Sequence, residues 1–196
     1  MKSLFVAVGG LLIGALTLVL QGLLPGSWGH LANSGATWVV AAFFAGAYLG
    51  RPALHGTVVL FGEVVGYYGA AATFLNQREP QALVGPAVWL AVALVAGPIF
   101  GIAGAWWRDE QRPIRRIVAV ALLGGVFIAE GLYLMITLGY LAEGTMMLAL
   151  GILTPALQRS GADRWRSLAA LVPVTALGLL AYWGIGAFSQ AVFTNA

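Results

Sequence analysis

The chain has 196 residues, of which 60% are hydrophobic and only 9% are charged. An ordinary soluble domain has about 25% charged residues, so a soluble protein of this composition could not cover its surface with polar groups. In lipid the exposed surface has to be apolar, and the composition is then expected. The chain has no cysteine, which excludes a disulfide framework and thiol chemistry. The sequence therefore predicts one all-α, polytopic transmembrane domain over residues 1–196.

Seven apolar segments follow one another along the chain. Their approximate limits are Ser3–Leu24, Leu31–Gly50, Ala53–Leu75, Ala82–Trp107, Ile117–Ile136, Leu138–Leu157 and Leu168–Phe193. A helix rises 1.5 Å per residue and the hydrocarbon core is about 30 Å thick, so about 20 residues cross it. Asn33 and Ser34 weaken the start of the second segment. The sixth contains Glu143 and ends at Thr154-Pro155, which leaves a short or re-entrant piece open.

The first segment follows a single lysine and superficially resembles a signal peptide. Its apolar run is too long for the hydrophobic region of a signal peptide, and no clear small-x-small cleavage site follows it. We expect it to be retained as the first transmembrane helix.

The basic residues decide between six and seven crossings. If all seven segments cross and the N-terminus is cytoplasmic, nine of the ten basic residues face the cytoplasm and only Arg78 faces out. These nine are Lys2, Arg51, Arg108, Arg112, Arg115, Arg116, Arg159, Arg164 and Arg166. If the sixth segment dipped and returned, the last three would be stranded outside. The positive-inside pattern therefore predicts a seven-helix bundle in the plasma (inner) membrane, with the N-terminus cytoplasmic and the C-terminus outside.

Two glutamates lie deep within the apolar segments. Glu63 is about 15 Å past Ala53 along its helix, near the midplane, and Glu130 is about 20 Å past Ile117, in the outer half. No lysine or arginine lies at a comparable depth. An isolated carboxylate in such surroundings takes up a proton instead of staying charged. These acids could donate hydrogen bonds while protonated, exchange protons with a water-filled cavity, or bind a cationic ligand.

Aromatic residues accompany both acids. Tyr67 follows Glu63 and Tyr133 follows Glu130 on the same helical faces, and Tyr182 and Trp183 lie at a similar depth in the last segment. A group of aromatic faces and carboxylates suits a flat or cationic organic solute. The predicted ligand- or proton-binding residues are therefore Glu63, Glu130, Tyr67, Tyr133, Tyr182 and Trp183. Ordinary helix packing through protonated glutamates and buried rings explains the same pattern.

The remaining aromatic residues and Glu143 have simpler interpretations. Trp106, Trp107 and Trp165 are predicted at the cytoplasmic interface, and Trp28, Trp38, Trp89 and Tyr140 at the outer one. Glu143 lies a few residues from the outer surface, and we expect its side chain to reach water.

Several classes of activity lack the residues they need. Neither His30 nor His55 is placed to pair with a deep serine, and no HExxH or paired-aspartate motif is present. Lys2 is the only lysine, so no lysine in the last segment can form a retinal Schiff base. We expect no enzyme activity, no cofactor and no bound metal. Expected partners are membrane lipids, a small-molecule solute or a membrane-protein partner, and a nucleic-acid role has no support.

The overall pattern of about 200 residues, glycine-rich helices, short loops and an outer-half group of aromatic residues and carboxylates loosely resembles a known family. It resembles the substrate-binding membrane subunits of energy-coupling-factor vitamin transporters, and it also looks like uncharacterised small bacterial membrane proteins. Those vitamin-binding subunits typically have six helices, whereas this chain reads as seven. The resemblance covers the architecture of the chain and no motif, so it implies no residue assignments.

The leading hypothesis is a membrane protein that binds or transports a small organic solute, with proton coupling through Glu63 and Glu130. The alternative is a non-catalytic accessory or structural subunit of a larger membrane complex, in which the glutamates and glycines serve helix packing. The first hypothesis requires the two acids to face a shared, hydrated cavity.

Overall fold

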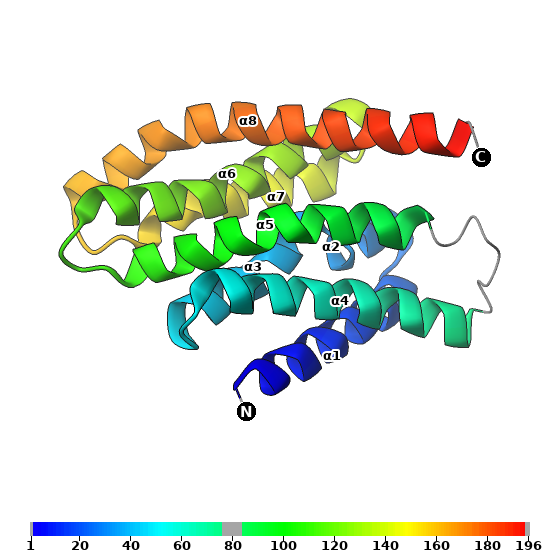
Figure 1. Ribbon diagram of the computed structural model, residues 1–196. Coiled ribbons are helices and arrows are strands. Elements are labelled where there is room, and N and C mark those ends of the chain that lie inside the picture. The colour runs from blue at the N-terminus through cyan, green and yellow to red at the C-terminus, as the bar shows by residue number, and fades with distance from the viewer. Residues whose placement is uncertain (1, 76–83, 195–196) are drawn as a thin grey trace.

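The computed structural model describes residues 2–75 and 84–194, and within these ranges all regular structure is helical (Figure 1). The elements in chain order are α1 (Lys2–Leu23), η1 (Gly26–Trp28), α2 (Gly29–Ala32), α3 (Gly35–Tyr48), α4 (Pro52–Phe74), α5 (Val84–Arg108), α6 (Pro113–Thr137), α7 (Leu141–Leu153), η3 (Thr154–Leu157) and α8 (Gly161–Thr194). The short α2 is a single turn, and η1 and η3 are 3₁₀ helices. The seven longer α-helices confirm the predicted seven-helix, all-α bundle. The predicted outer loop that carries Arg78 lies outside the described residues.

Five of these helices, α1, α4, α5, α6 and α8, are long and apolar enough to cross a membrane. The α3 helix has 14 residues and the α7 helix has 13. At 1.5 Å per residue, each rises only about 20 Å. The η3 turn continues α7, so that the two form an apolar helical stretch over Leu141–Leu157. The second and sixth apolar segments, which polar residues interrupt in the sequence, are therefore the two short helices α3 and α7.

One end of the bundle collects the basic residues that the sequence places on a single side of the membrane. We call it the basic end, and it holds the nine residues from Lys2 to Arg166 named above. Arg159, which lies between η3 and α8, forms an ion pair of 2.6 Å with Glu110 in the turn between α5 and α6. Gln158 donates a hydrogen bond of 3.0 Å to the carbonyl oxygen of Arg116. These contacts bring the end of α7 and η3 beside the start of α6, which excludes a re-entrant sixth segment.

The two chain ends lie toward opposite ends of the bundle. In Figure 1 the N-terminus lies at the bottom, left of the centre and on the side of the α3–α4 and α5–α6 turns, and the C-terminus lies at the far right. An odd number of crossings requires this separation. Which end faces the cytoplasm stays a prediction from the charge pattern.

Helix limits differ from the apolar segments wherever a polar residue caps a helix. The α3 helix begins at Gly35, not near residue 31, because the Ser34 hydroxyl oxygen accepts the Thr37 N–H at 3.2 Å and so caps the helix. The α8 helix begins at Gly161, seven residues before the apolar segment, after Ser160 accepts the Asp163 N–H at 3.1 Å. Hydropathy marks the lipid-facing part of a helix, whereas capping marks its start.

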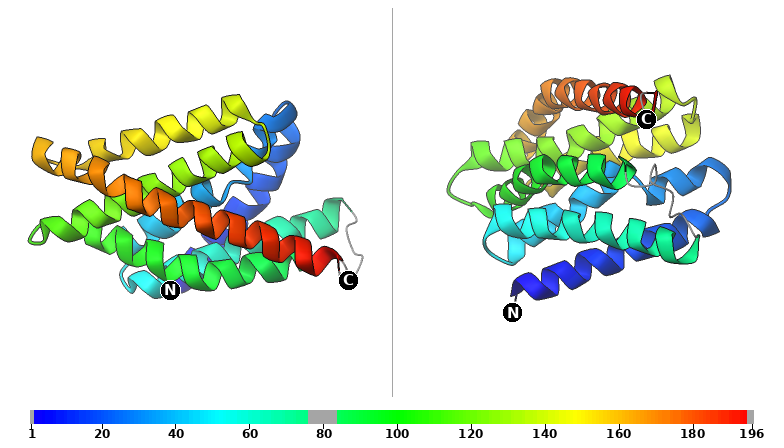
Figure 2. Two further views of the ribbon diagram at one scale, coloured as in Figure 1. Left: turned by 90° about the horizontal axis from the view of Figure 1, so that it is seen from above. Right: turned by 45° about the vertical axis from the view of Figure 1, so that its right-hand side comes forward.

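The helices pack around two hydrophobic clusters, and several neighbours in space are not neighbours in the chain, as for α1 with α4 and α3 with α5. The first lies among α1, α3, α4 and α5, and the second among α3, α5, α6 and α7. The α6 helix is the most enclosed, with 61% of its apolar window buried, whereas only 11% of the α8 window is buried. Figure 2 shows α8 lying across the outside of the bundle, over α6 and α5. The α6 helix is thus the central support of the C-terminal half.

Glycines allow α4 to approach its neighbours on both sides. A Cβ atom on Gly56 would lie 2.9 Å from the Cα atom of Gly101 on α5. A Cβ atom on Gly62 would lie 2.9 Å from the Cα atom of Gly10 on α1. Real Cβ atoms essentially never approach so closely, so the backbones meet only because these residues have no side chain. The α4 helix is therefore held tightly between α1 and α5.

We expect Gly56→Ala to lower the thermal unfolding temperature in detergent, because overpacking of a close contact costs about 1–3 kcal/mol. Gly69→Ala is the matched control on the same helix, since nothing lies within 4 Å of its Cβ position. Equal unfolding temperatures for the two variants would contradict the close α4–α5 contact.

The absence of cysteine allows a direct test of orientation with single introduced thiols. Ser160 is exposed at the basic end, and Ala142 is exposed near the start of α7 at the opposite end. We expect a membrane-impermeant thiol reagent to label Ala142→Cys in intact cells, and Ser160→Cys only after permeabilisation. The reverse pattern would invert the predicted orientation.

Candidate functional site

Glu130 on α6 is buried at a meeting point of three helices. Its Oε2 atom accepts hydrogen bonds from the Ser34 hydroxyl at 2.8 Å, the Ala36 N–H at 2.7 Å and the Tyr182 hydroxyl at 2.8 Å. The side chain is 7% exposed. Three donors from α3 and α8 thus converge on one oxygen of α6.

The start of α3 explains why a carboxyl group is needed here. The first N–H groups of a helix have no partner within the helix, and the positive end of the helix dipole favours a negative group. Ser34 and Ala36 are both buried, so water does not supply the missing acceptor. Glu130 supplies it from another helix, 94 residues away in sequence from Ala36. The arrangement acts as an additional cap for α3.

Two of the predicted tyrosines join this group. The rings of Tyr133 and Tyr182 stack with their centroids 5.6 Å apart at an interplanar angle of 26°. A Cβ atom on Gly35 would lie 3.0 Å from the Tyr182 hydroxyl oxygen, so the ring reaches the first residue of α3. The structure therefore brings Glu130, Tyr133 and Tyr182 together, and we call these three residues with Ser34 the α6 group.

Trp183 does not belong to the α6 group. Its side chain is 46% exposed, although the preceding Tyr182 points into the bundle. Successive residues of an α-helix point about 100° apart, so neighbours in sequence do not share a face.

Glu63 lies in different surroundings. Its side chain is 0% exposed, and within the described residues neither carboxyl oxygen has a hydrogen-bond partner. One turn later on α4, the Tyr67 hydroxyl donates a hydrogen bond of 2.7 Å to the side-chain oxygen of Gln21 on α1. The Tyr67 ring also meets the edge of Trp38 on α3, with centroids 6.0 Å apart.

Trp38 differs from its predicted place in the outer aromatic belt. It is 8% exposed and packs in the first hydrophobic cluster, and its indole N–H is buried without a partner in the described part of the chain. The reason is the later start of α3, which places Trp38 in the first turn, facing α4. We call Glu63, Tyr67, Trp38 and Gln21 the α4 group. In this group the two Glu63 carboxyl oxygens are acceptors without a hydrogen-bond partner in the described residues, and the Trp38 indole N–H is a donor without one.

No side-chain hydrogen bond or ring contact links the two groups among the described residues; a backbone bond of 3.1 Å, from the Trp38 N–H to the Ser34 carbonyl oxygen, joins them. The α3 helix contributes to both, through Ser34 and Ala36 on one hand and Trp38 on the other. Each acid therefore has to be considered by itself, and the contacts do not support the shared cavity that the sequence-based hypothesis required.

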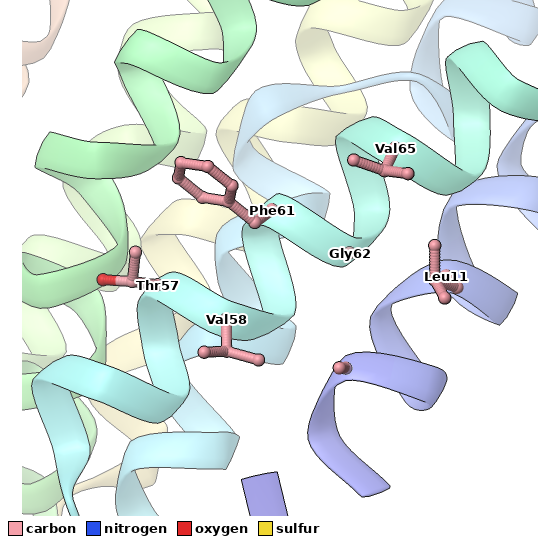
Figure 3. Close-up of a pocket in the computed structure, with 7 residues that line it drawn as sticks. Leu11, Thr57, Val58, Phe61, Gly62 and Val65 are labelled. Atoms are coloured by element: carbon pink, nitrogen blue, oxygen red, sulfur yellow. The ribbon is translucent and has the colours of Figure 1, made fainter. Parts of the chain in front are cut away.

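A surface groove with a volume of about 360 Å³ lies between α1 and α4 (Figure 3). Its lining residues are mostly apolar, namely Ala7, Leu11, Thr57, Val58, Phe61, Gly62 and Val65. The one hydroxyl among them, on Thr57, donates to the Ala53 carbonyl oxygen at 2.9 Å. Neither Glu63 nor Glu130 lines this groove. It offers no free polar side chain to a solute.

A third acid, Glu143, behaves differently from its prediction. It is buried, with 3% exposure, and its carboxylate accepts a hydrogen bond from the Ser27 hydroxyl instead of reaching water. It lies in the first turn of α7, where the helix dipole favours an acid. Beside it, the rings of His30 and Tyr140 stack with their centroids 4.9 Å apart. The position of an acid at a helix start was the signal that could have identified this contact.

No group of three or more histidine, cysteine, aspartate or glutamate side chains that could hold a metal ion occurs within residues 2–75 and 84–194. The site is therefore described by its carboxyl, hydroxyl and indole groups alone.

Comparison with protein families adds one finding. The model of a family described as "Family of unknown function (DUF6518)" matches residues 1–188, which is nearly the whole chain. The chain belongs to this family. The searches of curated proteins and of solved structures gave no match. Membership of DUF6518 agrees with the resemblance to uncharacterised membrane proteins, and these matches give no support to the resemblance to energy-coupling-factor subunits.

We expect Tyr182→Phe to lower the thermal unfolding temperature, because the loss of one partner of a buried polar group costs about 1–3 kcal/mol. Tyr133→Phe is the matched control: its ring stacks on Tyr182, and its hydroxyl makes no hydrogen bond within the described residues. If both variants unfold at the wild-type temperature, the Tyr182–Glu130 bond does not stabilise the bundle.

Proposed function

We propose that this membrane protein binds or transports a small organic solute with coupling to a proton, and that Glu63 carries the proton. The observation that supports the proposal is the complete burial of the Glu63 carboxyl group with both oxygens unpaired in the described residues.

Burial without partners is costly for any polar group and far more costly for a charge. A carboxylate in an apolar interior is stable there only as the neutral acid, unless a cation or a donor reaches it. Ionisable groups at this depth typically belong to substrate paths or proton relays. Glu63 is therefore suited to hold a proton in the described conformation and to release it when water or a ligand reaches the side chain.

The neighbouring side chains support a ligand of a particular kind. The Trp38 indole N–H is a second buried group without a partner, and such groups call for a specific explanation. The Trp38 and Tyr67 rings form an edge-to-face pair on the same side of the bundle. An acid beside aromatic faces favours an organic cation, through charge and cation–π contact. The proposal involves no covalent step on the solute.

The roles of the two acids then differ. Glu130 has three donors on one oxygen, so we assign it to holding α3, α6 and α8 together. Tyr182 shares this positioning role. The α4 group is the part of the molecule that we propose to contact the solute or the proton.

A purified sample first identifies the solute, because mass spectrometry of the native protein detects any small molecule that remains bound. Proteoliposomes loaded with a pH-sensitive dye then report proton movement on addition of that solute. We expect Glu63→Gln to remove solute-dependent proton flux while the protein remains folded. The amide has a similar shape to the carboxyl group but cannot take up and release a proton as the carboxyl group does.

The matched control is Glu110→Gln, which makes the same chemical change at an exposed acid on the basic end. It should leave the proton flux unchanged. Solute uptake by Glu63→Gln with wild-type proton coupling would refute the role proposed for this residue.

An accessory or structural subunit of a larger membrane complex is the second candidate. It is favoured by Glu130, whose bonds all hold helices to one another, and by the close glycine contacts of α4. A native gel of solubilised membranes distinguishes the two candidates. The accessory role gives a larger assembly that Glu130→Gln disrupts, together with no solute-dependent flux in the wild type.

A further inference from the structure

A small polar pocket lies at the basic end, away from the α4 and α6 groups. Its volume is about 270 Å³, and it is formed by the start of α1 and the turn that leads into α4. The lining residues are Lys2, Ser3, Leu49, Gly50, Arg51 and His55. Pockets for drug-sized ligands have about 300–1,000 Å³, so this one suits a small ion or a headgroup.

The pocket carries positive charge without a compensating acid. Neither Lys2 nor Arg51 takes part in an ion pair in the described part of the chain. The first turns of α1 and α4 contain no acidic residue. Three of the other seven basic residues at this end do have acidic partners, namely Arg159 with Glu110, Arg115 with Asp109 and Arg166 with Asp163. This pocket therefore attracts an anion.

Two helix starts add to this attraction. The α1 helix begins at Lys2 and the α4 helix begins at Pro52, directly after Arg51. Arg51 makes no side-chain cap for α4, and its backbone is left-handed with φ of 43°. The N–H groups of a first helical turn and the positive end of the helix dipole are the features that bind phosphate at helix starts in other proteins.

His55 provides an independent observation. Its side chain lines the pocket and is 2% exposed, and its Nδ1 atom has no hydrogen-bond partner in the described residues. Its Nε2 atom lies 3.2 Å from the Ser3 hydroxyl oxygen. A hydrolytic Ser-His pair needs an acid on the other ring nitrogen, and none is present there. The pair is better explained as part of a binding site that awaits a polar partner.

We infer that this pocket binds an anionic phosphate group, either free phosphate or the phosphomonoester headgroup of a lipid. A phosphate group has several strong acceptor oxygens, which match the donors that Lys2, Ser3 and Arg51 bring to one small space. The position at the end of two membrane helices suits a headgroup, and the size suits the free ion as well. The inference does not depend on the proposed transport function, because it involves neither Glu63 nor the α4 group.

The test uses the full-length protein in nanodiscs and two probes. In phosphatidylcholine nanodiscs, inorganic phosphate is compared with chloride at equal ionic strength, and binding is measured as a rise in the unfolding temperature. In a second set, phosphatidic acid replaces part of the phosphatidylcholine, and native mass spectrometry counts the acidic lipids that remain bound.

We expect Arg51→Gln to weaken binding of the effective probe about five- to tenfold, the typical contribution of one basic residue near a membrane surface. Lys2→Gln should have a similar effect, and because Lys2 is exposed it keeps the test valid if Arg51→Gln does not fold. Arg112→Gln removes one charge from the same end, outside the pocket, and should leave binding unchanged.

The outcomes are distinct. Stabilisation by inorganic phosphate identifies the free ion, and retention of phosphatidic acid without a phosphate effect identifies the headgroup; either supports the site if the pocket variants lose it. The inference is overturned if neither probe binds, or if Arg112→Gln weakens binding as much as Arg51→Gln, since the basic end would then act as a general charged surface. Loss of proton flux in Glu63→Gln with intact phosphate binding would separate the two proposals.

Discussion

The buried start of α3 is the constraint on which the centre of this bundle depends. A helix that begins inside an apolar environment leaves N–H groups that lipid cannot satisfy. The hydroxyl oxygen of the capping residue Ser34 accepts the N–H group of Thr37, and Glu130 on α6 accepts the N–H group of Ala36. The same Glu130 oxygen also binds the hydroxyl of Tyr182, which ties the weakly enclosed α8 to the interior. The single carboxyl group of Glu130 thus links α3, α6 and α8 to one another.

The two deep glutamates look equivalent in the sequence and are not equivalent in the structure. Each lies in a long apolar segment, has a tyrosine three or four residues later and lacks a nearby basic residue. The difference is made by α3, whose N-terminus is directed at Glu130 and not at Glu63. The buried Glu130 carboxyl group is therefore stabilised by its hydrogen-bond partners, whereas both oxygens of the buried Glu63 carboxyl group have none among the described residues. For this reason the proposed function assigns contact with the solute or the proton to Glu63 and not to Glu130.

Much of the architecture follows from the sequence because it depends on properties that a single segment carries. Apolar length predicts the helices, and the charge pattern correctly places the α7 end beside Arg116. The partners of Glu130 could not be predicted, since Ser34 is 96 residues away and was interpreted only as a weak point in its segment. A serine before an apolar helical run is a capping signal, and that reading would have moved the start of α3 and buried Trp38. The Trp183 side chain is partly exposed for a similar local reason, because its neighbour Tyr182 takes the inward-facing position.

Both polar regions that lack partners, the α4 group and the pocket at the basic end, lie along the contact between α1 and α4. A side chain on Gly14 would collide with the backbone carbonyl of Glu63, so α1 lies directly over the helix that carries this acid. The α5 side of α4 is closed by equally tight backbone contacts at Gly56 and Gly101, within the enclosed part of the bundle. The α1 helix lies at the edge of the bundle, since only 22% of its apolar window is buried. Lys2 and Arg51 both line the pocket at the basic end of this contact, and an anion that binds both would hold the two helices together there.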